Sequence, residues 1–244
     1  MLENKNNIKT IEVCLGSNGH NGVYEKFSFD DCNNVHALVS GSAEARRLFI
    51  KTMTQAIHNK YLDDLLVRVL DTSDLTKGLP EYIKCSNECT VESLVNDLSE
   101  LNDILIERGR EMLGVGCTTI NAYNDKCPNK SMKKLLLIVN VNDSRDLWHI
   151  IKTLESVLRL GRTRGVHVVL LAPSFKDELP KKHLVFFNTR FVFKSTPVES
   201  ELLLGTDIAS KLKDPVRSAY VLDCLPTAEF CLTKLDFDYK EKVS

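Results

Sequence analysis

The sequence predicts an α/β protein in which a mostly parallel sheet carries helices on both faces and ends in an antiparallel strand pair. The segments 35–40, 133–142 and 166–172 are each built around a run of apolar residues, which is typical of strands that are buried on both faces. Between these runs stand segments whose apolar residues recur at helical spacing, of which 43–57 and 91–113 are the clearest. Strands and helices that alternate in this way indicate parallel strands joined by helical crossovers.

The N-terminal part begins with a strand predicted at 8–16. Gly, Asn and Asp are frequent in residues 17–34, which predict turns and a short edge element. The buried strand at 35–40 then leads into a helix at 43–57, whose apolar stripe is formed by positions 45, 48, 49, 53, 56 and 57. A further strand is predicted at 63–71.

The central part contains the longest helical pattern. Thr90 is the expected N-cap of this helix, which runs over 91–113 and ends at Gly114. Residues 118–132 are polar and contain Asn, Pro and Ser, so we expect an exposed loop there. The buried strand at 133–142 follows this loop.

The next helix is predicted over 144–165, where a glycine ends it. It carries Trp148, the only tryptophan of the chain. Because Leu147, Ile150 and Ile151 stand beside Trp148 in the helical pattern, we expect this side chain in the core rather than on an exposed docking surface.

The C-terminal part is predicted to contain short elements. A strand at 166–172 is broken by Pro173, and later segments alternate between strand and helix patterns. These segments are a strand at 189–195, a short helix at 197–205 that begins with a proline, and strands at 218–223 and 229–235 that form the antiparallel pair. Because no linker or internal repeat interrupts the chain, we expect a single domain over 1–244.

Composition excludes several classes of protein. The 244 residues are 43% hydrophobic and 27% charged, which is ordinary for a globular domain. The formal net charge of −1 and the mixed surface charges give no basic face, so no nucleic acid is expected as a partner. The 8 cysteines contain no CxxC pair, and no histidine stands near the closest pair, Cys85 and Cys89, at zinc-finger spacing, so we expect reduced thiols and no metal site.

Six segments, taken in order, resemble the motor domain of the FtsK/SpoIIIE family of RecA-like ATPases. The similarity covers roughly residues 8 to 235, and each segment matches a motif of that family. The segments are "HALVSG" before the Walker A position, "LLVRVLDTSDLTKGLPEYI", "LNDILIERGREMLGVGCTTINAYN", "KKLLLIVNVNDSRDL" at the Walker B strand, "LGRTRGVHVVLLAPS" and "ELLLGTDIASKLKDPVRSAYV".

The resemblance implies a RecA-like P-loop NTPase fold. The chain is most similar to the last, degenerate ATPase domain of the type VII secretion coupling ATPases of Gram-positive bacteria, the EssC/EccC family. It would then be the C-terminal module of a larger multi-domain protein and a cytoplasmic domain of a membrane-anchored secretion complex. Its implied partners are secreted WXG-type helical hairpins, other type VII substrates and the neighbouring ATPase modules of the same chain.

The Walker A loop is the first part of the nucleotide site that departs from its consensus. A working loop, G-x-x-x-x-G-K-[ST], cradles phosphates with backbone N–H groups, while its Lys reaches the β- and γ-phosphates and its hydroxyl binds Mg²⁺. Counted from Gly41, the chain has Arg46 in place of the second Gly, Arg47 in place of Lys and Leu48 in place of Ser/Thr. If the loop is one residue shorter, Arg46 takes the Lys position and Arg47 the hydroxyl position. Both counts lose the hydroxyl that binds the metal.

The remaining loop residues also disfavour a nucleotide. The segment after Gly41 contains Ser42 and Glu44 but none of the inner glycines. A carboxylate about 4 Å from a phosphate charge costs roughly 4 kcal/mol at an effective dielectric constant near 20. The helix N-terminus still attracts anions, so weak ATP binding remains compatible with the sequence.

The Walker B position departs from its consensus as well. An Asp is needed there after four apolar residues, but "LLLIV" is followed by Asn140. If the motif is aligned on 146–147 instead, Asn142 and Asp143 occupy the acidic pair. A neutral amide brings no charge to Mg²⁺. At the polar sensor position of many family members the chain has Pro173, which lacks a donor.

These departures predict a domain without catalytic residues, bound Mg²⁺ or any other cofactor, although the family is one of ATPases. Arg162 occupies the place of a family arginine near module contacts, but its position at a helix C-terminus also explains it. His36 is expected to pack or to form hydrogen bonds, and His167 to lie in the core. The alternative hypothesis is a regulatory nucleotide-binding module or a DNA translocase that still binds ATP.

Overall fold

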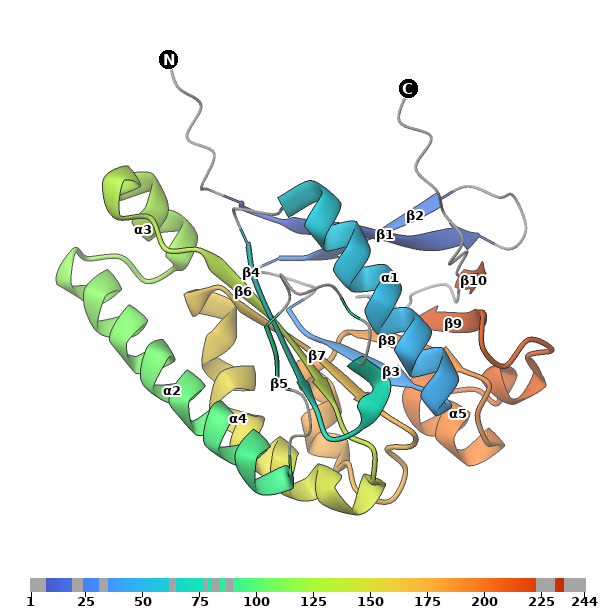
Figure 1. Ribbon diagram of the computed structural model, residues 1–244. Coiled ribbons are helices and arrows are strands. Elements are labelled where there is room, and N and C mark those ends of the chain that lie inside the picture. The colour runs from blue at the N-terminus through green and yellow to red at the C-terminus, as the bar shows by residue number, and fades with distance from the viewer. Residues whose placement is uncertain are drawn as a thin grey trace.

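The computed structural model of the protein describes residues 8–18, 24–30, 35–61, 65–76, 79, 84–86, 90–222 and 231–234 (Figure 1). The strands are β1 (Ile11–Asn18), β2 (Tyr24–Phe29), β3 (Ala37–Ser40), β4 (Leu65–Asp71), β5 (Lys84–Ser86), β6 (Lys134–Asn140), β7 (Val166–Ala172), β8 (Thr189–Phe193), β9 (Ser218–Leu222) and β10 (Cys231–Lys234). The α-helices are α1 (Ala43–Tyr61), α2 (Val91–Gly114), α3 (Ile120–Lys126), α4 (Leu147–Arg164) and α5 (Pro197–Leu204). Short 3₁₀ turns are η1 (Asp74–Thr76), η2 (Pro128–Lys130), η3 (Ser144–Asp146), η4 (Lys181–Phe186) and η5 (Ile208–Lys211).

Within the described residues the strands form one 10-stranded sheet in the order β2-β1-β10-β9-β8-β3-β7-β6-β4-β5. All neighbours from β8 to β5 pair in parallel. The remaining pairs, from β2 to β8, are antiparallel. The predicted fold class is therefore confirmed, and the antiparallel part also includes β1 and β2, which the sequence did not assign to it.

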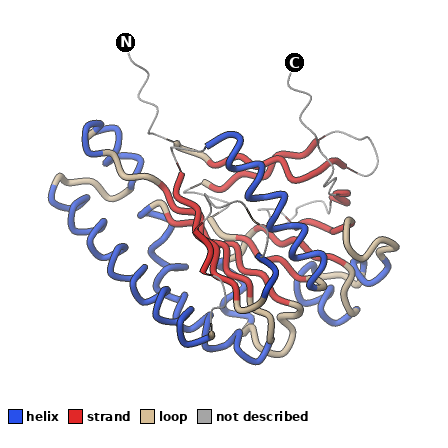
Figure 2. Tube along the Cα trace, viewed as in Figure 1, coloured by secondary structure: helices blue, strands red, loops and turns tan. Residues whose placement is uncertain are grey.

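The parallel strands are buried on both faces, as their apolar runs predict. In β6, Leu135, Leu137 and Val139 join the core shared with α2 and α4. The alternate residues Leu136 and Ile138 join the second core, which α1 covers. Figures 1 and 2 show the same layers, with α1 over one face of the sheet and α2 and α4 over the other.

Residues 118–132 do not form the exposed loop that we expected. They contain α3, whose N-cap Thr119 accepts a hydrogen bond from the backbone N–H of Ala122 at 3.3 Å. Ile120 and Tyr123 of this helix are buried. The prediction was wrong because so short a helix shows too little apolar periodicity to stand out from a polar loop.

Trp148 is not buried in the core, so this prediction was also wrong. Its side chain is 39% exposed on α4. The buried stripe of the helix is formed by its neighbours, among them Leu147, Ile150, Ile151 and Leu154. Trp148 stands one position round the helix from Leu147, and successive helix residues point about 100° apart. The indole therefore lies at the border between core and solvent.

Both histidine predictions are confirmed. The Nδ1 atom of His36 accepts the backbone N–H of Val168 at 3.0 Å, which leaves Nε2 to donate to the carbonyl of Leu158 at 3.1 Å. Burial lowers the pKa of His36 to about 3, and nearby His167 contributes further. His167 is also fully buried, and burial lowers its pKa to about 4. Both rings are therefore neutral and structural.

The expectations about cysteines and metal ions can be compared with the described residues. Among the described side chains, Cys117 and Cys127 are free thiols. No described helix combines the length and the hydropathy that crossing a bilayer requires. The described residues also contain no group of three or more His, Cys, Asp or Glu placed to share a metal ion.

Candidate functional site

The carboxyl ends of the central parallel strands meet at one edge of the sheet. Asp71 at the end of β4 pairs in register with Asn140 at the end of β6, and Asn140 pairs with Leu171 of β7. On the other side of β7, Ser40 at the end of β3 pairs with Ala172. Open α/β sheets bind ligands outside this edge, so a nucleotide would be expected to bind here.

The connection from β3 to α1 is very short. Only Gly41 and Ser42 separate the strand from the helix. The backbone N–H of Gly41 donates to the carbonyl of Ala172 at 3.3 Å, and that of Ala45 donates to the hydroxyl of Ser42 at 3.3 Å. The N–H of Arg46 donates to the carbonyl of Ser42 at 3.0 Å. These three donors serve the turn and the first helical turn, so they are not available to phosphate oxygens.

Gly41 is required by packing in this structure. A Cβ atom added to Gly41 would lie 2.9 Å from the Cβ of Phe193 on β8, closer than real Cβ contacts. Phe193 is fully buried and cannot move aside cheaply. The glycine that resembles the start of a Walker A loop therefore has a structural cause that needs no phosphate.

Arg46 fills the space between the strand ends. Its side chain is 1% exposed, although arginine is rarely buried completely. The Nε atom donates to the carbonyl of Gly41 at 3.1 Å, and Nη1 donates to the carbonyl of Val141 at 3.0 Å and to the Oδ1 atom of Asn140. Burial lowers the pKa of Arg46 to about 10, and the charge of Asp71 partly opposes this shift. The guanidinium therefore remains a cation at neutral pH.

Asn140 connects this cation to a buried carboxylate. Its Nδ2 atom donates to Oδ1 of Asp71 at 2.6 Å and to the hydroxyl of Ser73 at 3.1 Å. An ionised carboxylate only accepts and a guanidinium only donates, so a side chain between Asp71 and Arg46 must do both. An amide does this, whereas a second carboxylate would face Asp71 with like charge.

Asp71 is the residue of this group that the sequence did not reveal. It is fully buried, and its two oxygens accept hydrogen bonds from the turn that follows β4. The donors are the N–H and hydroxyl of Ser73, at 3.0 and 2.8 Å, and the N–H of Thr76 at 3.0 Å. The sequence showed only an aspartate at a strand end. Nothing in the sequence indicated that it would face Asn140. Arg46, Asn140 and Asp71 are called the Arg46 network below.

The other residues expected at the nucleotide site stand outside the Arg46 network. Ser42, Glu44 and Arg47 are exposed on the turn and the first turns of α1, and Leu48 is half-buried. The structure thus brings Arg46 and Asn140 together but directs Arg47 to the surface. Arg46 is the residue that the shorter of the two counts assigns to the Walker A lysine, and Arg47 is the one that the longer count assigns to it.

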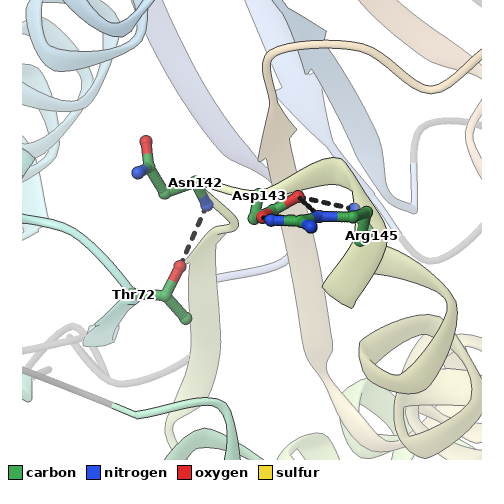
Figure 3. Close-up of polar contacts among 4 residues, drawn as sticks. All are labelled: Thr72, Asn142, Asp143 and Arg145. Carbon is green, nitrogen blue, oxygen red and sulfur yellow. Dashed lines mark hydrogen bonds and ion pairs between the residues drawn. The ribbon is translucent and has the colours of Figure 1, made fainter.

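Asn142 and Asp143 lie on the turn after β6 (Figure 3). Asn142 is exposed, and its backbone N–H donates to the hydroxyl of Thr72 at 2.9 Å. The carboxylate of Asp143 accepts hydrogen bonds from the side chain and the backbone N–H of Arg145, with two distances of 3.0 Å. These bonds lower the pKa of Asp143 to about 2. Asp143 is therefore engaged by its own turn rather than by the Arg46 network.

A second buried carboxylate, also missed from the sequence, lies beyond the β3 end. Glu199 of α5 is 2% exposed and accepts hydrogen bonds from the hydroxyls of Ser40 and Ser174, both at 2.8 Å. It also accepts from the backbone N–H of Phe175 at 2.9 Å. Thr196 and Glu199 have capping-box spacing, which favours a glutamate turned back toward the helix N-cap. Here the side chain instead joins α5 to the ends of β3 and β7.

Arg162 lies exposed in the last turn of α4. A cation at this position is favourable for the helix dipole, as expected from the sequence. Pro173, at the sensor position, is exposed after the end of β7. Neither side chain belongs to the Arg46 network.

No protein-family model and no curated protein matches the sequence. Solved structures with a similar fold do exist. The chain superposes with a TM-score of 0.71 and 15% identity on the cytoplasmic domain of the type VII secretion ATPase EccC of Thermomonospora curvata, over 95% of this chain and 29% of that one. It also resembles ATPases 2 and 3 of EccC of the same organism in complex with a signal sequence peptide, with a TM-score of 0.68 and 12% identity over 96% of this chain and 41% of that one.

A third similar structure is the conjugation coupling protein TcpA of pCW3, in its monomer form with ATPγS. The TM-score is 0.70 and the identity 16%, over 94% of this chain and 67% of TcpA. The chain thus spans less than half of the EccC structures that it matches, and identities this low compare folds rather than activities. The chain has the fold of an FtsK/SpoIIIE-type ATPase domain.

Proposed function

We propose that this chain is a non-hydrolysing FtsK-like domain of a type VII secretion coupling protein. The observation that supports this proposal most strongly is the side chain of Arg46, which is bonded to Asn140 and Val141 at the edge where a nucleotide would bind. Residues Gly41, Ser42, Glu44, Arg46, Arg47, Leu48, Asn140, Asn142 and Asp143 would then be the remains of a nucleotide site.

The chemistry of phosphoryl transfer explains why this arrangement disfavours hydrolysis. The reaction relies on a metal ion that neutralises charge on the phosphates and on residues that hold this ion. In the Arg46 network a guanidinium donates to the oxygen of Asn140, the oxygen that a metal shell would use, and a buried cation repels Mg²⁺. Weak nucleotide binding at the start of α1 would not need the metal.

A domain that does not turn over ATP can still bind partners. We propose that it recruits secreted WXG-type hairpin proteins and other type VII substrates, or regulates ATPase modules beside it in a longer chain. The EccC structure with a signal sequence peptide supports this choice, because the similar fold there is found with such a peptide. The domain would then act on the cytoplasmic side of a membrane-anchored complex.

The likeness to TcpA favours a second candidate, a module of a DNA-conjugation machine or a regulatory domain that binds ATP. The net charge of −1 disfavours the DNA alternative, because phosphate contacts require a concentration of cations. Binding of duplex DNA that weakens steeply as salt is raised would support this candidate.

The recruitment proposal predicts nucleotide-independent binding of a substrate. A WXG-type hairpin protein should bind the purified chain with a dissociation constant of about 1–100 µM. The affinity should not change when ATP and Mg²⁺ are added, and removal of the C-terminal tail of the hairpin should abolish binding. Isothermal titration calorimetry measures all three. If a panel of hairpins fails to bind the folded chain, recruitment is wrong, whereas ATP-dependent binding would favour the regulatory candidate.

A further inference from the structure

An aromatic surface patch lies on the same face of the sheet as α4. It is formed by Trp148 on α4 and by Val185 and Phe186 on η4, and is called the Trp148 patch below. Trp148 is 39% and Val185 68% exposed, while Phe186 is half-buried against the core. Single exposed apolar residues are ordinary on protein surfaces, but two aromatic rings next to an exposed valine are the composition of an interface centre.

The rings of the Trp148 patch are held in fixed positions. The ring of His183 contacts both, with its centroid 6.2 Å from that of Trp148 and 6.3 Å from that of Phe186. His183 is itself buried, so it anchors both rings to the core. The guanidinium of Arg159 lies 5.4 Å from the Phe186 ring centroid. A partner would therefore meet a preorganised surface and would lose little entropy by ordering it.

Cations predominate around the Trp148 patch. Lys181 and Lys182 of η4 and Lys152 and Arg159 of α4 are all exposed. The acid Glu155 of α4 is bound to Arg159 at 2.7 Å. Asp146 stands two residues before Trp148, and Asp177 and Glu178 stand shortly before η4. Asp177 contacts Lys176 at 3.6 Å.

The titration of His183 supports this distribution of charge. Burial lowers the pKa of His183 most, and Lys182 and Arg159 lower it further, whereas Glu155 opposes them. All three charged groups are therefore close enough to act on the ring that lies under the Trp148 patch. The local balance is two cations against one anion.

We propose that the Trp148 patch binds an acidic amphipathic helix of a partner protein. Apolar side chains one helical turn apart would cover Trp148, Val185 and Phe186, as in other helix-in-groove interactions. Carboxylates beside this apolar stripe would face Lys152, Lys181 and Lys182. The opposite charges select an acidic helix over a basic one of equal hydrophobicity. This inference does not depend on the secretion function proposed above.

The test uses the full chain and a synthetic helical peptide of about five turns, with Leu in one stripe and Glu on both sides of it. Trp148 is the chain's only tryptophan, so its fluorescence reports contact at the Trp148 patch directly. The Leu/Glu peptide should shift the emission to shorter wavelength with saturation. The same peptide with Lys in place of Glu should bind at least about tenfold more weakly. Each exposed charge pair contributes little by itself, but several pairs together account for this difference in affinity.

Two variants and one control decide between outcomes. Val185→Asp should abolish binding of the Leu/Glu peptide. Lys182→Glu should weaken the binding of the Leu/Glu peptide and strengthen the binding of the Leu/Lys peptide. Val198→Asp, at a position 61% exposed on α5, should change neither affinity. Equal binding of both peptides, or no effect of Val185→Asp, would overturn the proposal. Sedimentation showing a dimer that Val185→Asp dissociates would overturn it too, because the occupant would be a second copy of the chain.

Discussion

Replacing Arg46 with alanine should lower the free energy of unfolding by about 4 kcal/mol, because it breaks a buried charge network and leaves a cavity. Asn140, Gly41 and Val141 would each lose a hydrogen-bond donor. The charge of Asp71 would then remain in the protein interior without a compensating cation. Leaving a charge buried in this way is one of the few mechanisms by which a single substitution has so large an effect.

Urea denaturation followed by circular dichroism measures this loss. Arg47→Ala is the matched control, because Arg47 is the next residue on the same helix but is exposed. It should change the free energy of unfolding by less than about 0.5 kcal/mol. Arg46→Lys keeps the charge but offers fewer and less directed donors. Its loss of unfolding free energy should therefore lie between those of Arg46→Ala and Arg47→Ala. A loss below about 1 kcal/mol for Arg46→Ala would contradict a structural role for the Arg46 network.

Replacing Asn140 with aspartate, the residue of the Walker B consensus, should destabilise the protein by about 2–4 kcal/mol at pH 8. The two side chains have the same shape, so packing is unchanged. The substitution places a carboxylate oxygen where Nδ2 now donates to Asp71 at 2.6 Å. Two buried carboxylates this close cannot both ionise without a large penalty, although Arg46 would offset part of it.

The destabilisation caused by Asn140→Asp should become smaller as the pH is lowered. One carboxyl of the new pair would have a pKa above that of an unfolded aspartate, so the folded variant would bind a proton that the unfolded chain has already lost. Stability relative to the wild type should therefore rise as the pH is lowered from 8 to about 5. Urea denaturation at several pH values checks this trend. A difference that is independent of pH, or a variant as stable as the wild type at pH 8, would contradict the bridging role of the amide.

The sequence predicted the fold well where one physical pattern dominates. The strand β6 shows an unbroken apolar run because both of its faces are buried, and α2 shows a clean stripe because it packs on one face only. The helix α3 was missed because its few buried residues pack only locally. Trp148 was misplaced because apolar spacing locates the buried face of a helix only to within one residue. Trp148 lies at the border of that face, where one position separates a buried side chain from an exposed one.

The sequence predicted only part of the candidate site. Arg46 and Asn140 were found because a consensus motif assigns them positions along the chain. Their mutual hydrogen bond joins residues 94 positions apart, and the sequence carries no sign of it. Asp71 and Glu199 were missed because each has partners far away along the chain, Asn140 for Asp71 and Ser40 and Ser174 for Glu199. Which buried polar groups satisfy one another is decided by tertiary packing, not by local pattern.

The central claim is that the protein's own arginine fills the place of a nucleotide and its metal. Equilibrium titration of the wild-type chain with a fluorescent ATP analogue, with and without Mg²⁺, tests this claim most directly. We predict weak binding at most, with a dissociation constant above about 1 mM, and no increase in affinity when Mg²⁺ is added. Saturable binding in the micromolar range that requires Mg²⁺ would contradict the account, because Arg46 would then have to leave Asn140 to admit the ligand.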